Sequence, residues 1–358
     1  MRINLLDILN ILIKDPTASF NKIAKKLSLS PTTVKKAYNK LISENLISSV
    51  YALVNYPAID REMVSVFIKS HVRKWNMLEN ALDGHFYLRS RVRCIGSVAG
   101  IHAFFAIPKG TLPYLREFLE GLRNMNLLED YTLVTPASKW FYSEPDLKYF
   151  NSKTFTWKID WNKIREIYED VKPEFISGTD KSVMDKLTLA DFKIIDRLTV
   201  NARIRKKELA KFAGLKPYEL SRRIKFLHRE KVILKYRVSL GPRMIEHLSG
   251  FAVNAKCNGL TTRKIAAFFK TLPFQSTFIP TKDGFLAFIL ITSSAFIQLS
   301  SLLYENCTKL EISWLDYRYS KLWNIAYEAY KDGKWNMDYD FMVTKPLETI
   351  KKKIALAN

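Results

Sequence analysis

One segment of the sequence occurs twice, and this repetition constrains the fold more than any other feature. Residues 23–47 align with residues 209–233 without a gap, at an offset of 186 residues. Apolar positions match along the whole alignment, so chance similarity is a poor explanation. Such a chain is predicted to contain two copies of one structural unit. The matched pairs include Ala24 with Ala210, Lys25 with Lys211, Leu29 with Leu215, Pro31 with Pro217, and Ile47 with Ile233.

The chain is long enough for several domains, because its 358 residues exceed the usual size of one. Its longest apolar run, residues 285–291, has the length of a buried strand and falls short of the roughly 20 residues that span a membrane. The N-terminal residues carry apolar side chains at helical spacing and lack the cleavage site of a secretory signal. We therefore expect no membrane span and a cytoplasmic protein.

The cysteines and histidines give no sign of a metal or redox site. Cys94, Cys257 and Cys307 are odd in number, far apart and without a CxxC motif, which argues against a disulfide framework and a zinc cluster. The five histidines form no pair at the i,i+4 spacing of metal ligands on a helix. We expect three buried thiols, no metal and no cofactor.

Positive charge is the strongest compositional feature, with a net charge of +22. An evenly charged surface would serve solubility alone, but here the charge is concentrated. Between Lys186 and Arg237 the chain carries sixteen lysines and arginines against five acidic residues. A local excess of this kind attracts a polyanion and is typical of a nucleic-acid contact.

Each copy of the repeat begins with the pattern of three short helices followed by an extended segment, the plan of a winged helix-turn-helix. In the first copy the helices are expected at residues 5–13, 20–27 and 31–44. Ser30 is placed to cap the third helix, and Pro31 is tolerated at its first position. Val34, Tyr38 and Leu41 then form one apolar stripe, matched in the second copy by Leu220, Ile224 and Leu227.

The opposite face of each third helix presents hydrogen-bond donors, as a helix that reads double-stranded DNA requires. Lysine suits phosphate contacts, whereas arginine can also bind guanine through two hydrogen bonds. The following extended segments are expected to touch backbone phosphates. The candidate DNA-binding residues are Thr32, Thr33, Lys35, Lys36, Asn39 and Lys40 in copy one, and Lys216, Tyr218, Ser221, Arg222, Arg223, Lys225, Arg229, Lys235 and Arg237 in copy two.

After each helical unit, the pattern predicts the order strand, helix, strand, strand, helix, strand of a ferredoxin-like βαββαβ module. Trp140, Trp157, Trp323 and Trp335 recur after the last strands and are expected to tie each tail to its own module. The fold class is therefore α+β, with two winged helix-turn-helix domains and two ferredoxin-like modules in tandem. The expected domains are residues 1–58 (first winged helix), 59–140 (first module), 141–188 (connecting segment, with the linker at 171–188), 189–244 (second winged helix), 245–320 (second module) and 321–358 (C-terminal tail).

A winged helix followed by a βαββαβ module resembles the Lrp/AsnC transcriptional regulators, and here this archaeal-type unit is duplicated. Copy two keeps Gly214 in the turn and Arg223 at the family's usual arginine, where copy one has Ser28 and Ala37. The resemblance implies a sequence-specific, nucleoid-associated regulator of transcription that binds double-stranded DNA. It also implies a small-molecule effector at the ferredoxin-like modules and a homodimer. The family's Gly-x-x-Asp signature is not reproduced at residues 96–102 or 282–284.

Two other functions compete with this interpretation. An architectural protein would bind DNA through charge and deformability with little sequence preference, but it would not need two positioned reading helices. Siroheme decarboxylases resemble the same fold, and their histidine followed by Ala-Gly and their Asn-x-Met run are missing from both copies. His102 lacks these companions, and no nucleophile or phosphate-loop motif is present. We therefore expect no catalytic residues and no enzymatic activity.

Overall fold

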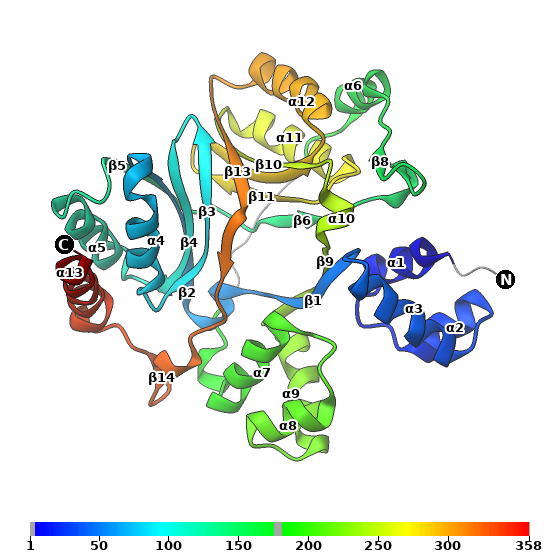
Figure 1. The fold of residues 1–358 in the computed structure, drawn as a ribbon, viewed down its shortest axis with the longest axis horizontal. Coiled ribbons are helices and arrows are strands. Elements are labelled where there is room, and N and C mark those ends of the chain that lie inside the picture. The colour runs from blue at the N-terminus through cyan, green and yellow to red at the C-terminus, as the bar shows by residue number, and fades with distance from the viewer. Residues whose placement is uncertain (1–3, 175–180, 358) are drawn as a thin grey trace.

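The computed structural model describes residues 4–174 and 181–357. Each copy starts with the expected three helices and one strand, which we call a head (Figure 1). The first head contains α1 (Leu5–Lys14), α2 (Phe20–Leu27), α3 (Pro31–Ser43) and β1 (Ile47–Val54), and the second contains α7 (Leu189–Val200), α8 (Lys206–Ala213), α9 (Pro217–Arg229) and β9 (Ile233–Leu240).

Local sequence explains where the third helix of each head, α3 or α9, begins. The Ser30 hydroxyl accepts a hydrogen bond from the backbone N–H of Thr33 at 3.1 Å and so caps α3. At the start of α9, the Glu219 carboxylate accepts from the backbone N–H of Lys216 at 2.8 Å. The turn before each helix needs a left-handed residue, supplied by Ser28 (φ 54°) and Gly214 (φ 72°).

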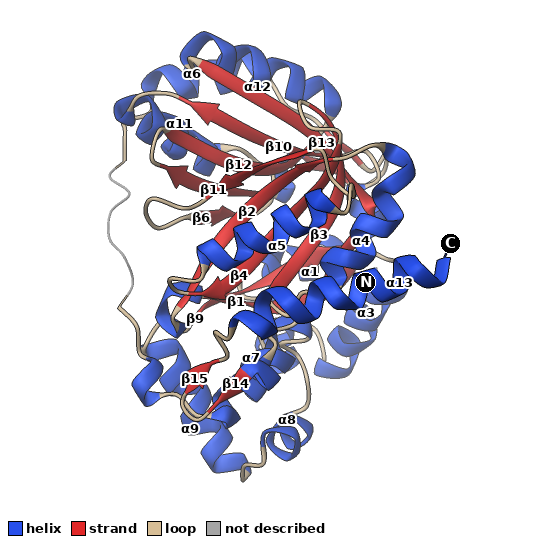
Figure 2. Ribbon diagram, turned by 90° about the vertical axis from the view of Figure 1, so that its left-hand side faces the viewer, coloured by secondary structure: helices blue, strands red, loops and turns tan. Residues whose placement is uncertain are grey.

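Both ferredoxin-like modules form as expected, with strand order 4-1-3-2 in each. Module 1 contains β2 (Arg61–Lys69), α4 (Trp75–Asp83), β3 (Leu88–Gly96), β4 (Gly100–Pro108), α5 (Leu112–Asn124) and β5 (Asp130–Val134). Module 2 contains β10 (Ser249–Lys256), α11 (Gly259–Thr271), β11 (Ser276–Thr281), β12 (Gly284–Ile291), α12 (Ser293–Asn306) and β13 (Lys309–Leu322). Figure 2 shows α4 and α5 lying over the strands of module 1, and α11 and α12 over those of module 2.

The two modules share one nine-stranded sheet, ordered β5-β2-β4-β3-β13-β10-β12-β11-β6, where β6 is Phe141–Ser143. β3 and β13 pair at the seam. The sheet curls so far that its two ends approach. A hydrogen bond shows this: Ala137 lies between β5 at one end and β6 at the other, and its backbone N–H donates to the carbonyl of Pro280 on β11. The helix-free faces therefore pack on each other, with the rings of His102 and Phe288 4.8 Å apart.

The two copies exchange segments. β1 and β9, the strands that follow α3 and α9, pair with each other in an antiparallel ladder. One hydrophobic core combines module 1 with the second head and the C-terminal tail, and another combines module 2 with the first head and the segment that follows module 1. Each core therefore contains parts of both copies, so neither copy is predicted to be stable alone.

This exchange corrects the expected role of the two tails. Residues 141–188 were expected to be a connecting segment, but they contain β6, a hairpin of β7 (Phe150–Asn151) and β8 (Thr156–Trp157), and α6 (Trp161–Asp170), all on module 2. The linker expected at residues 171–188 lies partly outside the described residues. Trp335 of β15 (Lys334–Trp335) packs in the core of module 1 beside β14 (Tyr330–Lys331), ahead of α13 (Lys345–Ala357). Trp157 and Trp335 thus anchor each tail to the other copy's module.

Within residues 4–174 and 181–357, no helix is long and apolar enough to pass through a membrane.

Candidate nucleic-acid interface

The outward face of α3 presents the predicted residues to solvent. Lys35 and Lys36 are exposed and have no ion pair within the described part of the chain. Thr32 and Asn39 are exposed beside them, while Lys40 lies 3.4 Å from Glu44 in a surface pair. The structure thus brings these five side chains to one accessible face.

Thr33 occupies a different position from its neighbours on α3. Its hydroxyl lies 2.8 Å from the hydroxyl of the capping residue Ser30, and its side chain is only partly exposed. This residue therefore helps to start the helix.

The outward face of α9 is more strongly cationic. Arg222 and Lys225 are exposed and have no ion pair with any described residue, and Tyr218 is 65% exposed. Arg229 contacts its neighbour Glu230 at 2.9 Å. Lys216 is exposed at the start of the helix. Ser221 is partly exposed, and its hydroxyl donates to the Pro217 carbonyl at 3.1 Å.

Arg223 turns toward α7 of the second head and is only partly exposed. Its guanidinium donates two hydrogen bonds to the Asp191 carboxylate, at 2.7 Å from Nε and 2.5 Å from Nη2. Asp191 is completely buried and also accepts from the backbone N–H and the hydroxyl of Thr188. The predicted DNA contact by Arg223 is therefore replaced by a brace between α9 and α7.

Lys235 and Arg237 were also expected to contact phosphates, but both bind the Glu144 carboxylate. Arg237 is 4% exposed, with its Nε 3.0 Å from Glu144 and its Nη2 2.6 Å from the Ser143 carbonyl. The Lys235 ammonium lies 2.7 Å from the same carboxylate. The physical reason is the exchange of segments, because β9 pairs with β1 next to β6 and does not extend into solvent as a wing.

Arg203 links the two heads, a role that the sequence did not indicate. Its Nη1 donates to the carbonyls of Pro16 and Ala18 in the first head, at 2.9 and 3.1 Å, and its guanidinium lies over the rings of Phe20 and Tyr38. Burial lowers the pKa of Arg203. In the sequence this residue is one of many in a basic cluster, so only the fold could distinguish it.

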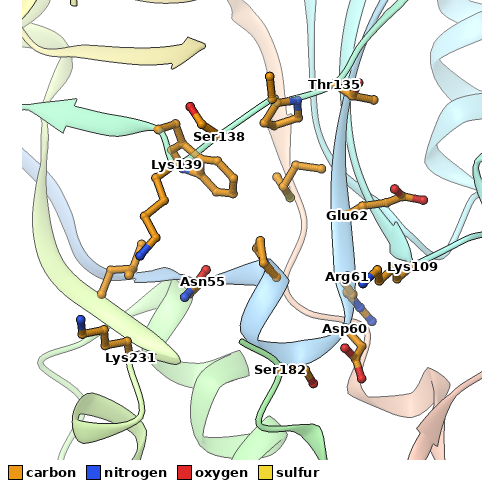
Figure 3. A pocket seen from close by; sticks show the side chains of 16 residues that line it. Asn55, Asp60, Arg61, Glu62, Lys109, Thr135, Ser138, Lys139, Ser182 and Lys231 are labelled. Carbon is orange, nitrogen blue, oxygen red and sulfur yellow. The ribbon is translucent and has the colours of Figure 1, made fainter. Parts of the chain in front are cut away.

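A pocket of about 520 Å³ lies between the second head, module 1 and residues 135–140 (Figure 3). Its size is typical of small-molecule sites. Its charged lining comes from Asp60, Arg61, Glu62, Lys109, Lys139 and Lys231, beside the apolar side chains of Pro57, Met63, Pro136, Trp140 and Leu234. Four basic residues against two acidic ones favour an anionic ligand.

Two residues of this pocket have unpaired donors. Arg61 is 2% exposed, and none of its guanidinium nitrogens has a hydrogen-bond partner among the described residues. The guanidinium stacks 3.6 Å from the Trp335 ring and 4.8 Å from that of Tyr87. Burial lowers the pKa of Arg61 to about 9. The amide nitrogen of Asn55 is likewise buried without a partner, so both residues lack the polar contacts that buried donors normally have.

His102, the histidine weighed in the enzymatic alternative, is buried between the two modules. Its Nε2 lies 2.6 Å from the Ser65 hydroxyl, and burial lowers its pKa to about 3. The described residues contain no group of three or more His, Cys, Asp or Glu side chains arranged to hold a metal ion.

Comparisons with known proteins agree with the helix-turn-helix assignment. Residues 1–48 match the family of winged helix-turn-helix DNA-binding domains. An uncharacterised HTH-type transcriptional regulator of Pyrococcus horikoshii is 29% identical over 133 residues, which cover 36% of this chain and 87% of that protein. An AsnC family transcriptional regulator from Agrobacterium tumefaciens matches 42% of this chain and all of its own, with 19% identity and a TM-score of 0.35.

A match over the full length comes from a different class of protein. The siroheme decarboxylase NirDL aligns with 99% of this chain and 99% of its own, with a TM-score of 0.58 and 10% identity. A second structure of that enzyme, in complex with an iron-uroporphyrin III analogue, matches with a TM-score of 0.56. At this identity the likeness concerns the fold alone.

These results define the class. The chain has a winged helix-turn-helix domain at residues 1–48, repeats the unit of helical head and βαββαβ module in tandem, and is similar over part of its length to an HTH-type transcriptional regulator. They also overturn one prediction. We expected no enzyme, yet two solved structures that align with 99% of this chain are of an enzyme.

Proposed function

We propose that this protein is a sequence-specific regulator of transcription that inserts α3 and α9 into successive major grooves of double-stranded DNA. The observation that carries the proposal is the pair of solvent-facing cationic helices, each docked by an apolar stripe, on two heads that Arg203 and the β1–β9 ladder hold together. Reading helices held in this way suit half-sites that are one or more helical turns apart.

The contacts divide by chemistry. Arg222 is the candidate for reading guanine, because its guanidinium is exposed and has no partner within the described chain. Lys35, Lys36 and Lys225 are candidates for phosphate contacts. Thr32, Asn39, Lys40, Lys216, Tyr218, Ser221 and Arg229 complete the proposed interface. The proposed interface leaves out four predicted residues whose side chains support the fold: Thr33, Arg223, Lys235 and Arg237.

The pocket beside Arg61 is the proposed effector site. It touches the second head through Lys231 and Leu234 and module 1 through Arg61 and Met63. An organic anion bound there would neutralise the cationic lining and fix the head relative to the module. The resemblance implied an effector at the ferredoxin-like modules, and this pocket borders module 1.

We also propose a cytoplasmic, nucleoid-associated protein that forms a homodimer of tandem chains. Ile95 and Trp314 pair across the seam between the modules and are each 56% exposed, so they offer an apolar contact for a second chain.

The test is a selection of bound genomic fragments at two salt concentrations. A sharp two-part motif supports the regulator, whereas binding without a motif, strongest at low salt, supports the architectural alternative. Replacing Lys35 and Lys36 by alanine should weaken binding to all fragments and reduce the slope of log affinity against log salt by about 2. The matched control replaces Lys351 and Lys352, an exposed pair on α13, and should leave both quantities unchanged.

A second candidate function is decarboxylation of a tetrapyrrole, which the full-length likeness to a siroheme decarboxylase favours. The cationic pocket could bind substrate carboxylates. Incubation of the purified chain with siroheme, followed by mass spectrometry of the pigment, separates the two candidates. Loss of carbon dioxide from siroheme would establish the enzyme, and an unchanged pigment together with a sharp DNA motif would establish the regulator.

A further inference from the structure

Cys257 and Cys307, which lie far apart in the sequence, come together at one end of module 2. Cys257 follows β10, and Cys307 ends α12 just before β13. β10 and β13 pair as far as Lys256 and Lys309. One step further, the backbone N–H of Thr308 donates to the Lys256 carbonyl at 2.8 Å. Cys257 therefore lies opposite Thr308, just beyond the paired strands, and Cys307 is the adjacent residue.

The two thiols are chemically unequal. A hydrogen bond joins them, and the Cys257 sulfur also lies 3.2 Å from the hydroxyl of Thr262. The bond to Cys307 lowers the pKa of Cys257 to about 7, and the same bond raises the pKa of Cys307. Cys257 therefore loses its proton more readily than Cys307, and the thiolate is the form that reacts with oxidants. Cys257 is 9% exposed and Cys307 is partly exposed.

The equivalent place in module 1 holds no thiol. There the backbone N–H of Glu129 donates to the Lys69 carbonyl, so Ser70 corresponds to Cys257 and Leu128 to Cys307. The Ser70 hydroxyl donates to the Leu127 carbonyl at 2.8 Å. The fold therefore accommodates serine and leucine at these two positions, and the cysteine pair is an addition specific to module 2.

We propose that Cys257 and Cys307 form a peroxide-sensitive thiol pair that closes to a disulfide. The Cys257 thiolate attacks one peroxide oxygen, the O–O bond breaks, and Cys257 becomes a sulfenic acid with release of hydroxide. The Cys307 sulfur then attacks the Cys257 sulfur and displaces its hydroxyl group. Overall, two thiols and one hydrogen peroxide give one disulfide and two waters.

The pair lies beside the contacts by which α6, at the upper right of Figure 1, docks on module 2. The Tyr168 hydroxyl donates to the side-chain oxygen of Asn306 at 2.7 Å, and Arg165 pairs with Glu305 at 2.5 Å. Both partners directly precede Cys307. A disulfide pulls Cys307 toward Cys257, so it displaces these two residues and loosens α6, the helix ahead of the second head.

The test treats the reduced full-length chain with hydrogen peroxide and counts thiols after unfolding, with intact mass measured without reductant. Wild type should lose two of its three thiols and two hydrogens in mass, and Cys94→Ser should also lose two thiols. Cys307→Ser should instead accumulate a sulfenic acid at Cys257 that dimedone traps. Hydrogen exchange of α6 should increase on oxidation of the wild type and not of Cys307→Ser.

Three results would overturn the proposal: retention of all three thiols at peroxide concentrations that oxidise free cysteine, participation of Cys94, or a bond between two chains. Serine at position 257 tests the same chemistry without a folding problem, because module 1 already carries serine there. Cys257→Ser should show no intramolecular disulfide and no dimedone adduct at the Cys257 position. These readouts do not depend on DNA binding, so the thiol-pair proposal and the proposed function can fail independently of each other.

Discussion

Adjacent arginines on α9 should respond in opposite ways to replacement by alanine. Arg223→Ala removes the partner of a completely buried carboxylate, and breaking such a pair costs about 3–5 kcal/mol. The Arg223 side chain is 24% exposed, and Asp191 keeps two hydrogen bonds from Thr188, so we expect a loss of about 2–3 kcal/mol in the free energy of unfolding. Arg222→Ala removes an exposed side chain and should change stability by less than about 0.5 kcal/mol.

DNA binding should show the reverse order. Arg222→Ala should weaken binding to the selected fragment by about 1–3 kcal/mol, or about 5- to 150-fold, and relax specificity at one base pair. Arg223→Ala should lose affinity only in proportion to the unfolded fraction of the second head. Urea unfolding followed by circular dichroism and fluorescence anisotropy with labelled DNA measure both quantities. If Arg223→Ala unfolded like the wild type and still lost its base preference, the brace would be refuted.

Three further changes test the cores and the pocket. Asp196 is 4% exposed, and burial raises its pKa to about 6. Between about pH 4 and 6 the folded state therefore binds more protons than the unfolded state, so stability falls as pH rises through that window. Thermal unfolding of Asp196→Asn should show a gain of about 1–2 kcal/mol at about pH 7.5 and almost none at about pH 4. Trp335→Ala should cost about 3–5 kcal/mol and release the second head together with module 1, because Trp335 contacts Phe192 and donates to the Ile59 carbonyl at 2.7 Å; hydrogen exchange confined to the tail would contradict this. Arg61→Met should change stability by no more than about 1 kcal/mol, because it removes a buried cation without hydrogen bonds, but it should abolish stabilisation by organic anions in a melting screen.

Periodicity predicted the elements well because each depends on local sequence. The apolar stripes of α3 and α9, the Ser30 cap and the strand–helix order of both modules all form as expected. The partners of individual side chains depend on contacts distant in the chain. Arg223 and Arg222 are neighbours of identical chemistry, and only the position of Asp191 decides which of them turns inward. The proximity of Cys257 and Cys307 likewise could not be predicted from the sequence, because the two residues are far apart in it and form no CxxC motif.

The exchange of segments has its own consequence for how a tandem protein can evolve two different heads. In a dimer of identical chains both reading helices carry the same residues, so any change in one appears in the other. Here the β1–β9 ladder and the two mixed cores bring the second head to the first within one chain, which makes their association independent of protein concentration. The two heads can then carry different exposed residues, Lys35 and Lys36 on the first and Arg222 and Lys225 on the second.

Arg203 adds a contact made from one side only, from the second head to the carbonyls of Pro16 and Ala18. A bound site should accordingly be asymmetric, with a stronger base preference under α9 than under α3, and swapping the two helix sequences should reverse that asymmetry.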